Sequence, residues 1–147
     1  MQQINLVYDG PMPDVFIDGQ PGIERLQAAF AEVFDARQPS VFNGEDTSVS
    51  FVDFLDRHTV AEVWPLKSRE FATKLNIYLF ERQDVAGKLA RLAGALRMSV
   101  AVDIGKDIKD DRAFLFTPEG EVLAGELVMM SAADGTEEIH FSEARLS

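Results

Sequence analysis

Apolar side chains recur every three or four residues in two segments of the chain, which is the spacing of one face of an α-helix. The first segment runs from Pro21 to Arg37, and the second begins at Asp84 and ends near Arg97. Asp84 is a residue type that caps helix N-termini, and the terminal arginines suit the negative end of the helix dipole. The sequence therefore predicts two amphipathic helices, each with one face in the core.

Runs rich in β-branched and aromatic residues, bounded by turn residues, predict the strands. The expected strands cover residues 4–8, 15–17, 49–55, 60–64, 98–104, 113–116, 121–130 and 138–141. An Asp-Gly-Pro turn predicts an opening hairpin between the first two runs, and residues 38–47 are expected to form a loop. The Thr-Pro-Glu-Gly sequence at 117–120 predicts a further hairpin.

Residues 66–82 fit two interpretations, because short apolar runs occur in both kinds of regular structure. Residues 67–73 can begin a helix. Residues 75–80 can either complete that helix or form a buried strand, and the strand is the favoured interpretation.

These elements predict one α+β domain over residues 1–147, with a mostly antiparallel sheet and two or three helices packed on it. Shifting the chain by 63 residues places Leu26 on Leu89 and brings the strand runs roughly into register. The shift suggests two βαββ-like halves, although common folding rules can produce the same order without a duplication.

The chain is strongly acidic, with a formal net charge of −11. Residues 1–50 carry a net −6, residues 51–100 carry +2 and residues 101–147 carry −7. A negative surface repels nucleic acid and anionic membranes, so neither is an expected partner, whereas a basic protein would be attracted. The alternative is that the acidity only keeps the protein in solution.

The absence of cysteine excludes disulfides and thiolate chemistry. The N-terminal residues have neither the basic stretch nor the apolar core of a signal peptide. No run approaches the about 18 apolar residues of a membrane span. We therefore expect a cytoplasmic location and no membrane partner.

One predicted loop is crowded with acids, namely Asp103, Asp107, Asp110 and Asp111. Hard cations prefer several carboxylates, but an EF-hand would require glycine and glutamate at positions that hold Ile108 and Phe114. Basic residues also interleave with the acids. We therefore expect a solvated charged loop and no metal ion.

No motif for a cofactor or a catalytic nucleophile is complete. Gly105-Lys106 lacks both the first glycine and the hydroxyl residue of a phosphate-binding loop. Gly19 and Gly22 lack the third glycine of a dinucleotide fingerprint. We expect no cofactor and assign no catalytic residue, and binding is favoured over catalysis.

Three further side chains have two interpretations each. His58 follows Asp56, which can tune an imidazole for acid–base work, but a turn histidine in water is favoured. His140 stands among glutamates with no nucleophile at a recognised spacing. Trp64, the only tryptophan, is expected in the core rather than at an interface.

Three classes of function remain open. The favoured class is an acidic protein-binding module, such as an immunity or inhibitor protein that occupies the active-site cleft of a basic toxin or nuclease. Its candidate contact acids are Asp103, Asp107, Asp110, Asp111, Glu45, Asp46, Asp53 and Asp56. The second class is an enzyme or small-ligand binder with a pocket between helix and sheet. The third is an assembly protein that forms a homodimer through an edge strand such as residues 121–130.

Overall fold

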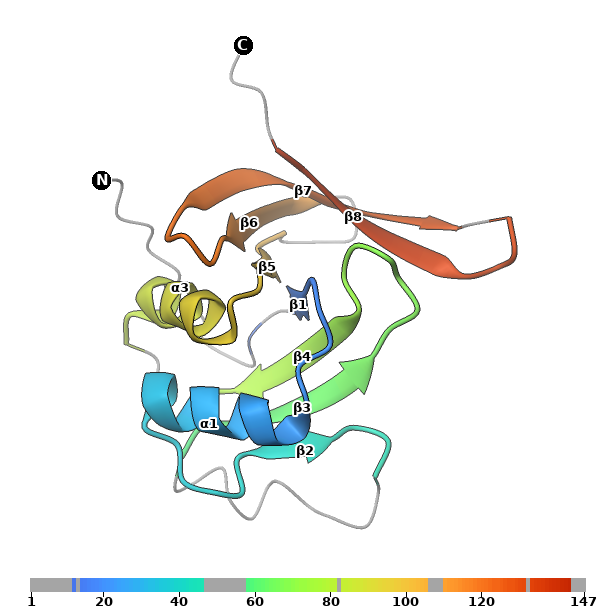
Figure 1. Ribbon diagram of the computed structural model, residues 1–147. Coiled ribbons are helices and arrows are strands. Elements are labelled where there is room, and N and C mark those ends of the chain that lie inside the picture. Colours follow the sequence, from blue (N-terminus) through green and yellow to red (C-terminus); the bar gives the residue numbers. More distant parts are fainter. Residues whose placement is uncertain are drawn as a thin grey trace.

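The computed structural model describes residues 12, 14–46, 58–81, 83–105, 110–131 and 133–143. In this part of the chain two helices pack on one eight-stranded sheet (Figure 1). The strand order is β2-β3-β4-β1-β5-β6-β7-β8, and every neighbouring pair except β2–β3 is antiparallel. The predicted α+β class, with a mostly antiparallel sheet, is confirmed.

Both predicted helices are present as α1 (Ile23–Phe34) and α3 (Val85–Leu96). Asp84 caps α3 as expected, because its side chain accepts a hydrogen bond from the Gly87 amide at 3.3 Å. The shift of 63 residues superimposes their buried faces, since the buried residues Leu26, Ala29, Phe30 and Val33 correspond to Leu89, Leu92, Ala93 and Leu96.

The strands are β1 (Val15–Ile17), β2 (Val41–Asn43), β3 (Val60–Pro65), β4 (Thr73–Tyr78), β5 (Val100–Asp103), β6 (Arg112–Phe116), β7 (Val122–Ser131) and β8 (Glu137–Glu143). The element order contains β-α-β-β twice before the β7–β8 hairpin. In space β4 lies between β3 and β1, and β1 lies between β4 and β5. β4 thus lies between the two strands of the β1-α1-β3 unit, and β1 lies between the two strands of the β4-α3-β5 unit. This interleaving is the split β-α-β topology.

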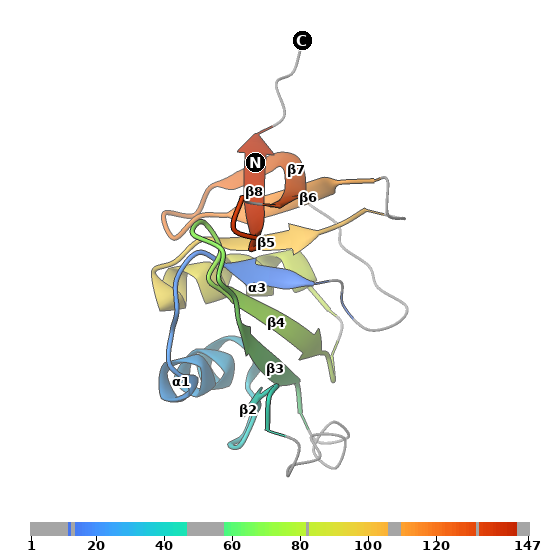
Figure 2. The same cartoon turned by 90° about the vertical axis from the view of Figure 1, so that its right-hand side faces the viewer.

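The sheet has an apolar core on each face. The larger core lies under the helices and includes Phe30, Leu89 and Val102. The smaller core lies on the helix-free face and consists of Phe16, Phe71, Ala101, Ala113, Leu127, Ile139 and Phe141. Its members come from the middle strands, from β7–β8 and from the loop between β3 and β4. The second core shows that the sheet curls, so that β8 and the β3–β4 loop meet over the helix-free face (Figures 1 and 2).

Two predictions about strand pairing need correction. All three residues of β1 pair with β4 on one side and with β5 on the other, so β1 has no free side for an opening hairpin with residues 4–8. Residues 121–130 form an edge strand only in part, because β6 pairs with Val122–Glu126, whereas the rest of β7 pairs with β8 alone among the described residues. The predicted strands at 4–8 and 49–55 lie outside the described residues.

Two predictions about element type also need correction. Residues 67–72 form a loop rather than a helix, and β4 then alternates between buried and half-buried residues, which confirms a strand within 75–80. Within the expected loop at 38–47, Val41–Asn43 pairs in parallel with β3. The buried Val41 is the only fully buried side chain of this strand, so the sequence pattern there was too short to indicate it.

Candidate functional site

A hollow of about 410 Å³ opens on the helix-free face, and we call it the acidic hollow. Its floor is apolar, because Phe16, Leu127 and Ile139 are all buried members of the smaller core. Its rim contains four carboxylates, and Val128 and Met129 complete the lining. The four rim acids are Asp14, Asp103, Asp110 and Asp111.

Adjacent strand ends bring these carboxylates together. Asp14 immediately precedes β1, and Asp103 is the last residue of β5. The Asp103 amide donates to the Asp14 carbonyl oxygen at 3.2 Å, which fixes the two residues side by side. Asp110 and Asp111 immediately precede β6, the next strand in the sheet. Asp14 and three acids that are distant from it in sequence therefore share one rim.

The acids differ in how their charge is compensated. Asp110 forms a two-point interaction with Arg112, with Nε and Nη2 each 2.8 Å from a carboxylate oxygen. Asp14 lies 3.6 Å from the Lys74 ammonium group. Among the described residues, Asp103 accepts from the Gly105 amide alone, at 2.8 Å. Counted over the described residues, the rim therefore has more negative than positive charge.

The surroundings of Asp103 change the pKa of its carboxyl group. Partial burial raises the pKa of its carboxyl group above the usual value, and the charges of Asp14, Asp110 and Asp111 raise it further. The Gly105 hydrogen bond acts in the opposite direction. A cation placed at this rim would relieve the repulsion that the carboxylates impose on one another.

The structure brings together three of the eight acids that the sequence singled out. Asp103, Asp110 and Asp111 line the acidic hollow. Glu45 and Asp46 follow β2, at the far edge of the sheet, and do not line it. Asp53, Asp56 and Asp107 lie outside the described residues.

Sequence reasoning missed Asp14 and the apolar floor. Asp14 is 89 positions from Asp103 in sequence, and nothing in the local pattern indicates that β1 and β5 are neighbours. The floor residues come from β1, β7 and β8. Only the pairing of the strands could have identified them.

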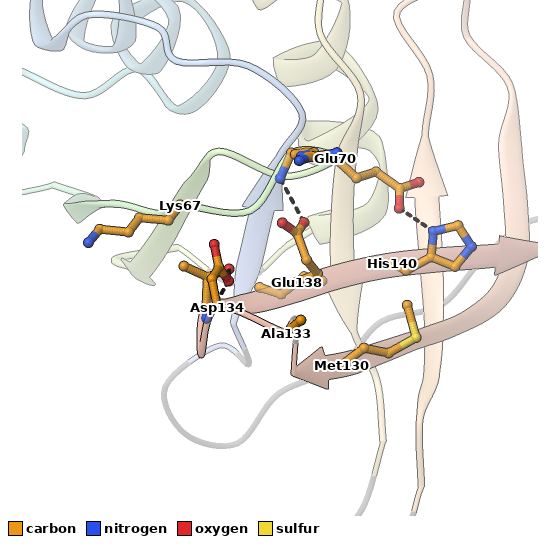
Figure 3. Close-up of a pocket in the computed structure, with 10 residues that line it drawn as sticks. Lys67, Glu70, Met130, Ala133, Asp134, Glu138 and His140 are labelled. Atoms are coloured by element: carbon orange, nitrogen blue, oxygen red, sulfur yellow. Dashed lines mark hydrogen bonds and ion pairs between the residues drawn. The ribbon is translucent and has the colours of Figure 1, made fainter.

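A second hollow, of about 690 Å³, lies between the β3–β4 loop and the β7–β8 hairpin, and we call it the loop hollow (Figure 3). Two carboxylates cross it in opposite directions. Glu70 of the loop accepts from the His140 Nδ1 and from the Phe141 amide. Glu138 of β8 accepts from the Arg69 amide at 2.8 Å. These side chains hold the loop against the outer edge of β8.

Several polar groups of the loop hollow take part in structural contacts. The Thr136 hydroxyl donates to Asp134 at 2.6 Å within its own turn. The His140 ring is exposed and pairs with Glu70, so the predicted neighbourhood of glutamates is present. Thr136 and Asp134 form a hydroxyl–carboxylate pair in this hollow, but the hydrogen bonds from Thr136 lower the pKa of the Asp134 carboxyl group, which makes it a weak base. The arrangement supports a role in fastening the sheet edge.

His58 and Trp64 differ from their expected environments. His58 is buried, with 6% of its surface exposed, and its Nε2 lies 3.1 Å from the Pro39 carbonyl oxygen. The favoured solvent-exposed histidine is therefore wrong. The hollow beside it has about 160 Å³, which is below the roughly 300 to 1,000 Å³ of ligand pockets. Trp64 is half-buried against Gly44 and belongs to neither core.

Neither described helix is long and apolar enough to cross a membrane. Among the described residues, no group of three or more histidine, cysteine or acidic side chains is arranged to hold a metal ion. No family model matches the chain, and no curated protein or solved structure is similar enough to support a comparison. Any functional inference therefore rests on the site itself.

Proposed function

We propose that the protein is a binding module whose acidic hollow takes a basic segment of another protein. One observation carries the proposal: four carboxylates from three strand ends converge on the rim of a hollow with an apolar floor. Charged rims around apolar centres are the usual anatomy of protein interfaces. Complementary charge would speed the encounter and select basic partners over acidic ones.

The chemistry of the hollow favours lysine or arginine side chains that carry apolar neighbours. The buried floor can accept an aliphatic stem or an adjacent apolar residue, and the rim can accept the cation. A guanidinium can also bind a carboxylate through two hydrogen bonds. The existing Asp110–Arg112 pair uses this geometry within the chain.

The finer form of the proposal is inhibition, in which the module covers the positively charged cleft of a toxin or nuclease. The acidic balance of the chain, at −11, supports attraction to such a cleft. Activity of the captured basic protein, measured with and without the module, separates an inhibitor from a module that binds without blocking.

The test compares two variants that lose the same formal charge. The hollow variant carries Asp14→Asn, Asp103→Asn and Asp111→Asn, whereas the control carries Glu24→Gln, Glu32→Gln and Asp35→Asn on and beside the exposed face of α1. The immobilised wild type, hollow variant and control are exposed to extract of the native host at low and at raised salt. We expect the wild type and the control to retain the same basic protein, and the hollow variant to lose it.

Equal loss from both variants would show that net charge alone attracts the partner. Equal retention by both would place the interface elsewhere. Either outcome would overturn the proposed role of the acidic hollow. Release of the retained protein as salt rises is expected, because the interaction depends on exposed charges.

A further inference from the structure

Strand β7 extends beyond the strand on its inner side. β6 pairs with Val122–Glu126 of β7, whereas β8 accompanies β7 as far as Ser131. The second half of β7 therefore has a partner strand on one side only in the described structure. The β7–β8 hairpin projects past the rest of the sheet (Figure 1).

The hydrogen bonding shows which backbone groups of β7 have no partner strand among the described residues. The Leu127 amide donates to the Asp111 carbonyl oxygen at 2.8 Å, so the backbone groups of Leu127 face the side of β6. Successive residues of a strand alternate in direction. Met129 and Ser131 consequently face the same side as Leu127, and Val128 and Met130 face β8. No strand of the described chain pairs with Met129 or Ser131 on that side.

This unpaired edge adjoins the acidic hollow. Met129 lines the hollow, and its side chain is 62% exposed. Asp111, whose carbonyl receives the last bond on this side, contributes a carboxylate to the rim. A segment paired with Met129 and Ser131 would thus lie beside the acids and above the apolar floor.

The other edge of the hairpin is not available in the same way. The amides of Ile139 and Phe141 point out of β8 and donate to the side chains of Ser68 and Glu70. Side chains of the β3–β4 loop therefore occupy the outer edge of β8 (Figure 3). Unprotected strand edges invite pairing with another chain. In the described part of the chain, β8 is protected where β7 is not.

We propose that the partner adds a strand to this edge of β7. The inference rests on the proposed function and specifies its geometry: an extended segment with alternating basic and apolar residues pairs with Met129 and Ser131. Strand addition supplies main-chain hydrogen bonds, and alternate side chains supply specificity. The basic side chains of the segment meet Asp103 and Asp111, and charge complementarity selects this occupant.

The experiment uses a short synthetic peptide that alternates arginine and valine, and a second peptide of the same sequence with N-methylated backbone amides. Methylation removes backbone donors and leaves every charge in place. We expect the methylated peptide to bind the full chain at least about tenfold more weakly, which corresponds to about one well-formed hydrogen bond. Amide hydrogen exchange should slow at Met129 and Ser131 when the first peptide binds. It should change little at Val128 and Met130, which already face β8.

Two protein variants complete the test. Met129→Pro removes the amide of an edge residue, a position at which proline is tolerated in strands, and Met129→Val retains the amide. We expect Met129→Pro to reproduce the tenfold loss and Met129→Val to bind as the wild type does. If Met129→Pro does not fold, the methylated peptide still provides the comparison.

The outcomes separate the two proposals. Equal binding of both peptides, with loss on Asp103→Asn and Asp111→Asn, would overturn strand addition and leave the acidic hollow as the site. A loss on methylation alone, with no effect of the acid variants, would support the strand and count against the acids. No binding of either peptide would overturn strand addition, while the pull-down with the two charge-matched variants decides the proposed function independently.

Discussion

Arg25 of α1 donates a hydrogen bond from its guanidinium group to the carbonyl oxygen of Leu96, the last residue of α3. The last carbonyl groups of a helix have no partner within the helix, and a positive charge is favourable beside them. α3 has no basic residue in its own last turn. One helix therefore caps the other, which ties the two halves of the split β-α-β unit together.

Replacement of Arg25 by alanine should lower the free energy of unfolding by about 1.5 to 3 kcal/mol, the range for a hydrogen bond that involves a charged group. Denaturation by urea measures the change. Arg91→Ala is the control, because Arg91 is exposed on α3 and makes no hydrogen bond or ion pair among the described residues. An equal loss in both variants would argue against the capping role.

The helices could be predicted because their periodicity is local. The apolar spacing of each helix and the Asp84 cap lie within a dozen or so residues of sequence. Both helices form where this local pattern predicts them. The neighbours of a strand are decided by contacts between distant segments. The pairing of Val15 with both Leu75 and Val102 could not be read from any local pattern, so the opening hairpin was wrong.

The same limit applies to the candidate site. Three of its acids, Asp103, Asp110 and Asp111, lie close together in sequence. This clustering alone made them candidate contact residues. Asp14 and the apolar floor could be identified only from the structure, in which the sheet curls and places β1 beneath β7 and β8. Composition leads to the expectation of a basic partner, but it could not predict a hollow.

Ser68 fastens the β3–β4 loop to the edge of β8. Its hydroxyl oxygen accepts from the Ile139 amide at 3.1 Å, and the residue is only 4% exposed. Ser68→Ala leaves that amide without a partner, so we expect a loss of about 1 to 3 kcal/mol in the free energy of unfolding. Faster amide exchange at Ile139 should accompany the loss. Ser142→Ala, at an exposed position of β8, serves as the control and should change neither quantity appreciably.

Gly44 allows the indole of Trp64 to pack against the backbone of the turn after β2. A Cβ atom at this position would lie 2.2 Å from the Trp64 ring, so Gly44→Ala must displace the ring. We expect a change in tryptophan emission, which reports on Trp64 alone, and a loss of about 1 to 3 kcal/mol in the free energy of unfolding.

Gly94→Ala is the matched control for that substitution. Its added Cβ would approach nothing closer than the Pro118 carbonyl oxygen at 4.0 Å. Because alanine is favoured over glycine within a helix, the variant should gain about 0.5 to 1 kcal/mol with unchanged emission. Unchanged emission in Gly44→Ala would contradict the packing described for Trp64.

Asp103 should make the folded protein less stable at neutral pH than it would be without this charge. Burial and the neighbouring acids raise the pKa of its carboxyl group, so the folded state holds the proton more tightly than the unfolded state does. The loss of stability caused by the Asp103 charge is absent below the pKa of the unfolded state. It appears as pH rises from the pKa of the unfolded state to that of the folded state, and it is complete at neutral pH. Asp103→Asn retains an acceptor for the Gly105 amide and removes the charge. We therefore expect the free energy of unfolding to rise by about 0.5 kcal/mol at neutral pH, the scale of a partly exposed charge interaction, with no gain at about pH 3.

Asp134→Asn should have the opposite effect on the free energy of unfolding at neutral pH. Hydrogen bonds from Thr136 lower the pKa of the Asp134 carboxyl group, so its charge stabilises the folded state above the unfolded pKa, and that stability is lost as pH falls through the lowered value. This variant should lose stability at neutral pH where Asp103→Asn gains it, and urea denaturation at both pH values measures the two effects. If Asp103→Asn also loses stability at neutral pH, the repulsion inferred at the rim is absent. A gain in stability together with weaker binding of the basic peptide is the result expected when a charge is retained for recognition at the expense of the fold.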